Sequence, residues 1–181
     1  MITSLQQFEQ VFLYAWRDDA TAEIPSILSV VYEPLEAGRR WLLWAGSPAF
    51  REFVPFEDAA HVREFAQALL DLPTAAGPYS REVDLAENET DERKGADERG
   101  EGDGIAMRGS TSTSEWCYAT LTVGREADRA CLPYLNYRSY YVVPGRPDLT
   151  SPGLQVFCGH VDVDRLHAEA RALLAALDDE G

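Results

Sequence analysis

Cysteines and long apolar runs are both scarce in this chain of 181 residues. Its three cysteines, Cys117, Cys131 and Cys158, are an odd number at wide spacing, unlike the disulfide framework of a small secreted domain. The apolar run at residues 11–16 is far too short to cross a bilayer, and no basic residue precedes it. We therefore expect a cytoplasmic protein without a signal peptide or a membrane anchor.

Basic residues are also few, since 16 Lys and Arg stand against 31 Asp and Glu, and the formal net charge is −15. A field of this sign repels phosphate backbones and anionic lipid headgroups, so we expect neither nucleic acid nor a membrane as a partner. The same charge speeds encounter with a basic protein, and it also keeps a protein soluble. Charge alone does not separate these two interpretations.

Motifs of catalysis are missing as well. The chain has no Gly-x-x-x-x-Gly-Lys-Ser/Thr phosphate loop, no Gly-x-Ser-x-Gly elbow and no His-Glu-x-x-His zinc motif. Three alternating glycines, Gly100, Gly102 and Gly104, neither follow a predicted strand nor open a helix, as a dinucleotide cradle requires. The sequence therefore favours a non-catalytic protein without a cofactor.

What is present indicates a packed core, because 45% of the residues are hydrophobic and 10% are aromatic. At the start, Thr3 and Ser4 can cap a helix whose apolar residues, Leu5, Phe8, Phe12, Ala15 and Trp16, fall near helical spacing. Residues 27–34 and 40–46 are rich in β-branched and aromatic side chains and read as a hairpin that turns at Gly38.

The two halves of the chain end alike, each with a strand followed by an amphipathic helix. Asp58 can cap a helix that Pro73 stops, and Asp162 can cap the last helix. Residues 53–70 and 157–174 align without a gap and pair Phe53 with Phe157, Asp58 with Asp162, Val62 with Leu166 and Leu69 with Leu173. A duplication explains this match, and so does independent use of a common arrangement.

Between these two helices, residues 115–124, 130–145 and 153–161 indicate antiparallel strands, the first with two distinct faces. The sequence therefore predicts an α+β fold, with one or two antiparallel sheets covered by about three helices. We expect residues 1–73 and 115–181 to form one compact domain, joined by a flexible, Gly- and Ser-rich linker at 74–114.

That linker contains the most acidic stretch, residues 87–104, with eight acidic and three basic side chains, whereas the other 163 residues still carry −10. Acidity is thus a property of the whole surface. The stretch holds no aromatic residue, so it has little to bury. We interpret it as a solvated linker, with docking of a basic partner as the alternative.

Tryptophan and tyrosine are plentiful in the predicted sheets, and both favour surfaces that are partly dry and partly wet. Some of them must pack in the core, but the stretch 134–141, with an arginine among its tyrosines, has the composition of a contact surface. The candidate partner-binding residues are Tyr134, Tyr137, Arg138, Tyr140, Trp116 and Tyr118.

A second hypothesis is a zinc module or a cysteine-dependent enzyme. Cys158 and His160 are two residues apart and share a face if both lie on a strand, where Cys131 or Cys117 can approach from a neighbour. The alternative is that the cysteines are simply buried. A third hypothesis is a small-molecule sensor with an aromatic pocket between sheet and helix.

A small acidic α+β protein with Trp and Tyr on its sheet and no catalytic motif is similar to the immunity and antitoxin proteins that neutralise toxins. The resemblance is one of type. It implies a module that binds another, basic protein and acts by occluding it, as an inhibitor or an adaptor. The sequence does not indicate an oligomeric state.

Overall fold

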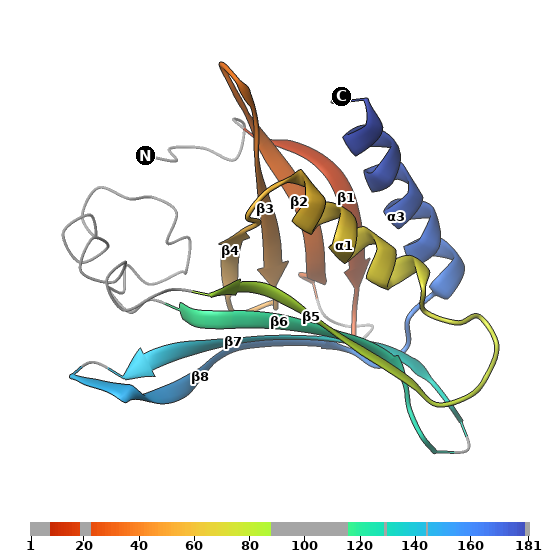
Figure 1. Cartoon of the computed structure of the whole chain (residues 1–181). Coiled ribbons are helices and arrows are strands. Elements are labelled where there is room, and N and C mark those ends of the chain that lie inside the picture. The colour runs from red at the N-terminus through yellow and green to blue at the C-terminus, as the bar shows by residue number, and fades with distance from the viewer. Residues whose placement is uncertain (1–7, 19–22, 88–115, 129, 144, 180–181) are drawn as a thin grey trace.

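The computed structural model describes residues 8–18, 23–87, 116–128, 130–143 and 145–179, and these form two four-stranded antiparallel sheets and two helices (Figure 1). Sheet A has the order β1-β2-β3-β4, and sheet B has the order β5-β6-β7-β8. Sheet A consists of β1 (Glu9–Trp16), β2 (Ser26–Leu35), β3 (Gly38–Gly46) and β4 (Arg51–Pro55), and helix α1 (Ala59–Leu70) follows it. Sheet B consists of β5 (Tyr79–Glu87), β6 (Trp116–Arg125), β7 (Pro133–Val143) and β8 (Arg146–Cys158), and helix α3 (Val163–Asp178) follows it.

The predicted α+β class with antiparallel sheets is confirmed, and each half has the same order of four strands and a helix. The hairpin that turns at Gly38 is β2–β3, and Gly38 has a φ of +99°, which only glycine adopts without strain. Both predicted caps are present, because the Asp58 and Asp162 side chains accept hydrogen bonds from backbone N–H groups in the first turns of α1 and α3.

The predicted N-terminal helix is wrong where the chain is described, because Glu9–Trp16 is strand β1, paired antiparallel with β2. Phe12 and Tyr14 are buried in the core, while Leu13 between them is 38% exposed, so the alternation of a strand decides the structure. Aromatic residues four apart happened to mimic helical spacing. The described residues thus contain two helices instead of about three.

The predicted linker at 74–114 is also wrong in its first part, where β5 pairs antiparallel with β6. Its apolar residues Val83 and Leu85 are buried, which a solvated linker could not achieve. The acidic stretch at 87–104 lies outside the described residues except for its first residue.

One hydrophobic cluster joins the two halves. It contains residues of both sheets and both helices, and α1 packs against α3 and β5 while α3 packs against β1 (Figure 1). The Phe65 ring of α1 meets Phe12 and Phe56 edge to face, at 5.7 and 5.6 Å between ring centroids. Each helix therefore touches the other half of the chain.

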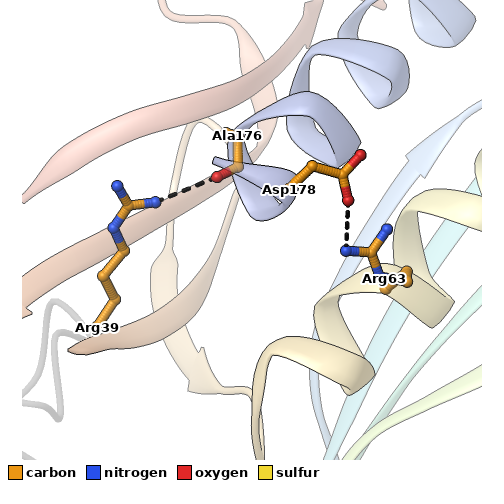
Figure 2. Close-up of polar contacts among 4 residues, drawn as sticks. All are labelled: Arg39, Arg63, Ala176 and Asp178. Carbon is orange, nitrogen blue, oxygen red and sulfur yellow. Dashed lines mark hydrogen bonds and ion pairs between the residues drawn. The ribbon is translucent and has the colours of Figure 1, made fainter. Parts of the chain in front are cut away.

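Helix α3 is fastened to sheet A and to α1 at its ends. At its start the Asp162 N–H donates to the Tyr14 hydroxyl at 2.8 Å. Near its end Arg39 of β3 donates to the carbonyl of Ala176 at 3.3 Å, and Arg63 of α1 pairs with Asp178 at 2.8 Å (Figure 2). Cations suit a helix C-terminus, because its last carbonyls have no partner within the helix. Neither helix is long and apolar enough to cross a membrane.

Candidate binding surface

Sheet B has one face toward the helices and sheet A, and none of the described elements covers its other face (Figure 1). Side chains alternate along its strands, so the buried residues define the inner face. On β6 and β7 the inner residues are Ala119, Leu121, Val123, Leu135, Tyr137, Ser139 and Tyr141. The residues between them make up the outer face of sheet B, chiefly Tyr118, Thr120, Thr122, Tyr134, Asn136, Arg138 and Tyr140.

Antiparallel register aligns these outer residues in rows across the sheet. Tyr118 lies opposite Tyr140, and their rings stack at 4.6 Å between centroids with 20° between planes. Tyr118 keeps 36% of its surface exposed, and Tyr140 is half-buried. The exposed Arg138 follows in the next row, opposite Thr120. The result is a rigid aromatic pair bordered by polar groups, as in many protein contact surfaces.

An acidic hollow of about 770 Å³ opens beside the tyrosine pair, between the first turns of α1 and the strands β5 and β6. Its floor includes the buried Leu85 and Ala119, and Tyr118 belongs both to its wall and to the outer face. Among the described residues that line it there is neither lysine nor arginine. Its five carboxylates are Glu57, Asp58, Glu64, Glu82 and Asp84.

His61 fixes the shape of this hollow. Its Nδ1 accepts from the Glu57 N–H at 3.2 Å, so the neutral ring carries its proton on Nε2, which donates to the Asp84 carbonyl at 2.7 Å. The start of α1 is thereby held against β5. The helix N-terminus contributes some positive potential, which offsets part of the carboxylate charge.

A second polar cluster lies inside the protein, at the junction of the sheets. Glu52 of β4 is only 1% exposed, and its carboxyl oxygens accept hydrogen bonds from the hydroxyls of Tyr137, at 2.5 Å, and Tyr141. Both tyrosines belong to β7, and Ser139 lies between them and accepts from the Leu154 N–H at 3.0 Å. Burial, and then the charge of Glu52, raises the pKa of Tyr137 well above its ordinary value.

This cluster corrects one predicted contact residue. Tyr137 has none of its surface exposed and belongs to the core, because it shares the inner face with Leu135 and Tyr141. Tyr134, Arg138, Tyr140 and Tyr118 do come together on the outer face of sheet B. Trp116 is placed in β6 opposite Tyr141, and its side chain lies outside the described residues.

The residues of the zinc hypothesis lie on separate elements. Cys158 is buried at the end of β8, opposite Leu135, and burial raises the pKa of its thiol. Cys131 lies in the β6–β7 turn with a φ of +45°, and its thiol donates to the Asp128 carbonyl at 3.1 Å. His160 is exposed beyond β8. Over the described part of the chain, no three His, Cys, Asp or Glu side chains are grouped to hold a metal.

The acidic lining of the hollow was not predicted from the sequence. Glu82 and Asp84 fell in the predicted linker, and the acids at the start of α1 were read only as part of a capped helix. The signal that could have found the β5 residues is the alternation of Val83 and Leu85 with charged neighbours. The hollow lies between a sheet and a helix, where an aromatic pocket was expected, but half of the described residues that line it carry carboxylates and Tyr118 is the one tyrosine among them.

Comparison with known proteins adds no assignment, since no family model, no curated protein and no solved structure matches the chain. The geometry of the chain itself carries the functional argument.

Proposed function

We propose that the protein is a non-catalytic binding module that holds a basic segment of another protein against the outer face of sheet B. The observation that carries this proposal is the position of Tyr118, which is shared by the acidic hollow and the tyrosine pair. A lysine or arginine of the partner enters the hollow, and its aliphatic stem packs on the tyrosine rings. Carboxylates then meet the charged head.

The rest of the molecule supports the same function. The formal charge of −15 attracts a basic partner over a distance and speeds association, while contacts at the aromatic pair slow release. Covering a basic surface also blocks whatever else that surface binds. We therefore propose occlusion as the mechanism, in the manner of an immunity or antitoxin protein or of an adaptor, acting in the cytoplasm.

The test is a pull-down from lysate of the source organism at low and raised salt, followed by affinity measurements with the purified partner. In the double variant Glu82→Gln, Asp84→Asn the hollow loses two charges at nearly constant size. We expect about tenfold weaker binding, since each partly exposed charge pair contributes up to about 1 kcal/mol.

The matched control is Glu23→Gln, Glu36→Gln, which removes the same net charge at exposed positions that flank β2 and do not line the hollow. It should change the affinity by less than twofold. Equal losses in both double variants would show that general charge attracts the partner and that the hollow does not bind it. A partner that is acidic, or whose affinity does not depend on salt, would contradict the proposal itself.

A further inference from the structure

A second pocket lies at the opposite end of the outer face of sheet B. It has a volume of about 590 Å³ and is formed where β5 begins, at the β6–β7 turn and on β8. Its apolar lining comes from Pro78, Tyr79, Ala127, Tyr134 and Phe157. This volume is ample for one large side chain of a partner.

The frame of this pocket is rigid. Arg125 donates to the carbonyls of Pro73, Thr74 and Cys131 at 2.7, 3.0 and 2.8 Å, so its guanidinium is committed to the backbone that surrounds the pocket. It ties the segment before β5 to the β6–β7 turn. Such a preformed site loses little entropy when a ligand enters it.

Glycine at position 124 makes room for Tyr134, one of the residues that line the pocket. A Cβ there would lie 2.7 Å from the Tyr134 hydroxyl and 2.6 Å from the Tyr79 carbonyl, so only glycine lets the Tyr134 ring lie across the strand. The Tyr134 and Phe157 rings stand 6.2 Å apart between centroids. Phe157 remains 44% exposed although it belongs to this well-framed site.

The two ends of the face differ in chemistry. One end has the tyrosine pair, and the other has an apolar aromatic pocket. Glu82 and Asp84 of the acidic hollow lie between these ends, in the rows of Asn136 and Arg138. Tyr134 and Tyr140 mark the ends on one strand. They are six residue steps apart, about 20 Å, whereas Glu82 and Asp84 are two and four steps along β5 from Ser80 of the pocket, about 7 and 13 Å.

We propose that the partner binds through two anchors, a basic side chain in the acidic hollow and a large apolar side chain in the Tyr134–Phe157 pocket, which lie between about 7 and 20 Å apart along the strands. This inference rests on the proposed function and specifies the partner it requires. Apolar anchors that fill a pocket carry much of the energy of an interface, whereas the polar rows between them mainly set the alignment.

The experiment selects a phage library of random 20-residue peptides on the full-length protein and measures one enriched peptide by fluorescence anisotropy. Phe157→Ser removes one wall of the pocket, and Ala127→Gln fills it without adding charge. Both positions are exposed, so neither variant should unfold the protein. Leu35→Ser, at an exposed apolar residue of sheet A, is the control.

We expect peptides with a basic and a large apolar residue, at least tenfold weaker binding to both pocket variants, and less than twofold change with Leu35→Ser. Replacing the apolar residue of the peptide by serine should weaken binding to the native protein as much as the pocket variants do. The same replacement should cause no further loss of affinity for the Phe157→Ser variant. That absence of additivity would place the two groups in contact.

The failures are distinguishable. If the pocket variants bind within twofold of the native protein while Glu82→Gln, Asp84→Asn still weakens binding, the apolar anchor is refuted and the proposed function stands. If the charge variant has no effect on peptides that still need Phe157, the proposed function fails instead. A selection without any binder counts against both.

Discussion

Removing the Tyr137 hydroxyl tests whether the buried Glu52 carboxyl holds the two sheets together. Tyr137→Phe keeps the ring and leaves no cavity, so the change isolates one hydrogen bond of 2.5 Å from sheet B to sheet A. A hydrogen bond to a charged group contributes about 1.5–3 kcal/mol, and Glu52 at 1% exposure has little access to water as a substitute. We therefore expect a loss of about 2 kcal/mol.

The assay is equilibrium urea unfolding at pH 7, followed by tryptophan fluorescence and by far-UV circular dichroism to check two-state behaviour. Tyr140→Phe is the matched control, because it removes a hydroxyl on the outer face, and it should change stability by less than about 0.5 kcal/mol. A triple variant, Glu52→Leu with Tyr137→Phe and Tyr141→Phe, should recover part of the loss, since the buried carboxyl and both of its tyrosine partners are removed together, while Ser139 loses its contact with the Tyr141 hydroxyl. A loss below about 0.5 kcal/mol in Tyr137→Phe would refute this account of the junction.

Further predictions concern the thiols, the helix ends and alkaline pH. Asp162→Ala should destabilise the protein by about 1 kcal/mol in urea unfolding, because the first turn of α3 loses its cap. Arg39→Met should cost about 1 kcal/mol in the same assay by freeing the Ala176 carbonyl, whereas an unchanged midpoint would make that contact incidental. Burial raises the pKa of the Cys158 thiol and of the Tyr14 phenol, so the unfolded chain loses these protons first; the urea midpoint should fall as pH rises above about 8.5, and again above about 10. In a Cys117→Ser background, a thiol reagent should modify the half-buried Cys131 faster than Cys158, and the reverse order would contradict the burial of Cys158.

The sequence predicted those elements whose pattern has a single interpretation. Both capped helices, the hairpin at Gly38, the strands β6 and β7 and the second half of β8 follow from period and turn residues. Strand β1 was predicted as a helix because its aromatic residues fit both the 3.6-residue period of a helix and the two-residue period of a strand. Only pairing with β2, a contact between residues distant in sequence, selects the strand.

Of the candidate contact residues, Tyr137 lies on the inner face of sheet B, and this error has a definite cause. Strand β7 carries tyrosines on both faces, so aromatic content alone cannot say which face is outside. The polar residues of β7 could have identified the outer face, because Asn136 and Arg138 alternate with Leu135 and Tyr137. Period-two reasoning from these four residues places Tyr137 inside. The hollow, by contrast, requires α1 to lie beside β5, which no local pattern specifies.

The internal match between the two halves gives one more reason to place the proposed binding surface on sheet B. Phe53 and Phe157 are aligned in sequence, and both lie on the outer face of their sheet. Phe53 is only 2% exposed and stacks between Phe8 and Trp44, whereas Phe157 is 44% exposed. The same position is thus covered within the chain in one half and left open in the other. Because Phe157 stands beside Tyr134 in an apolar pocket and is not an isolated exposed residue, its exposure favours the proposed partner that covers it.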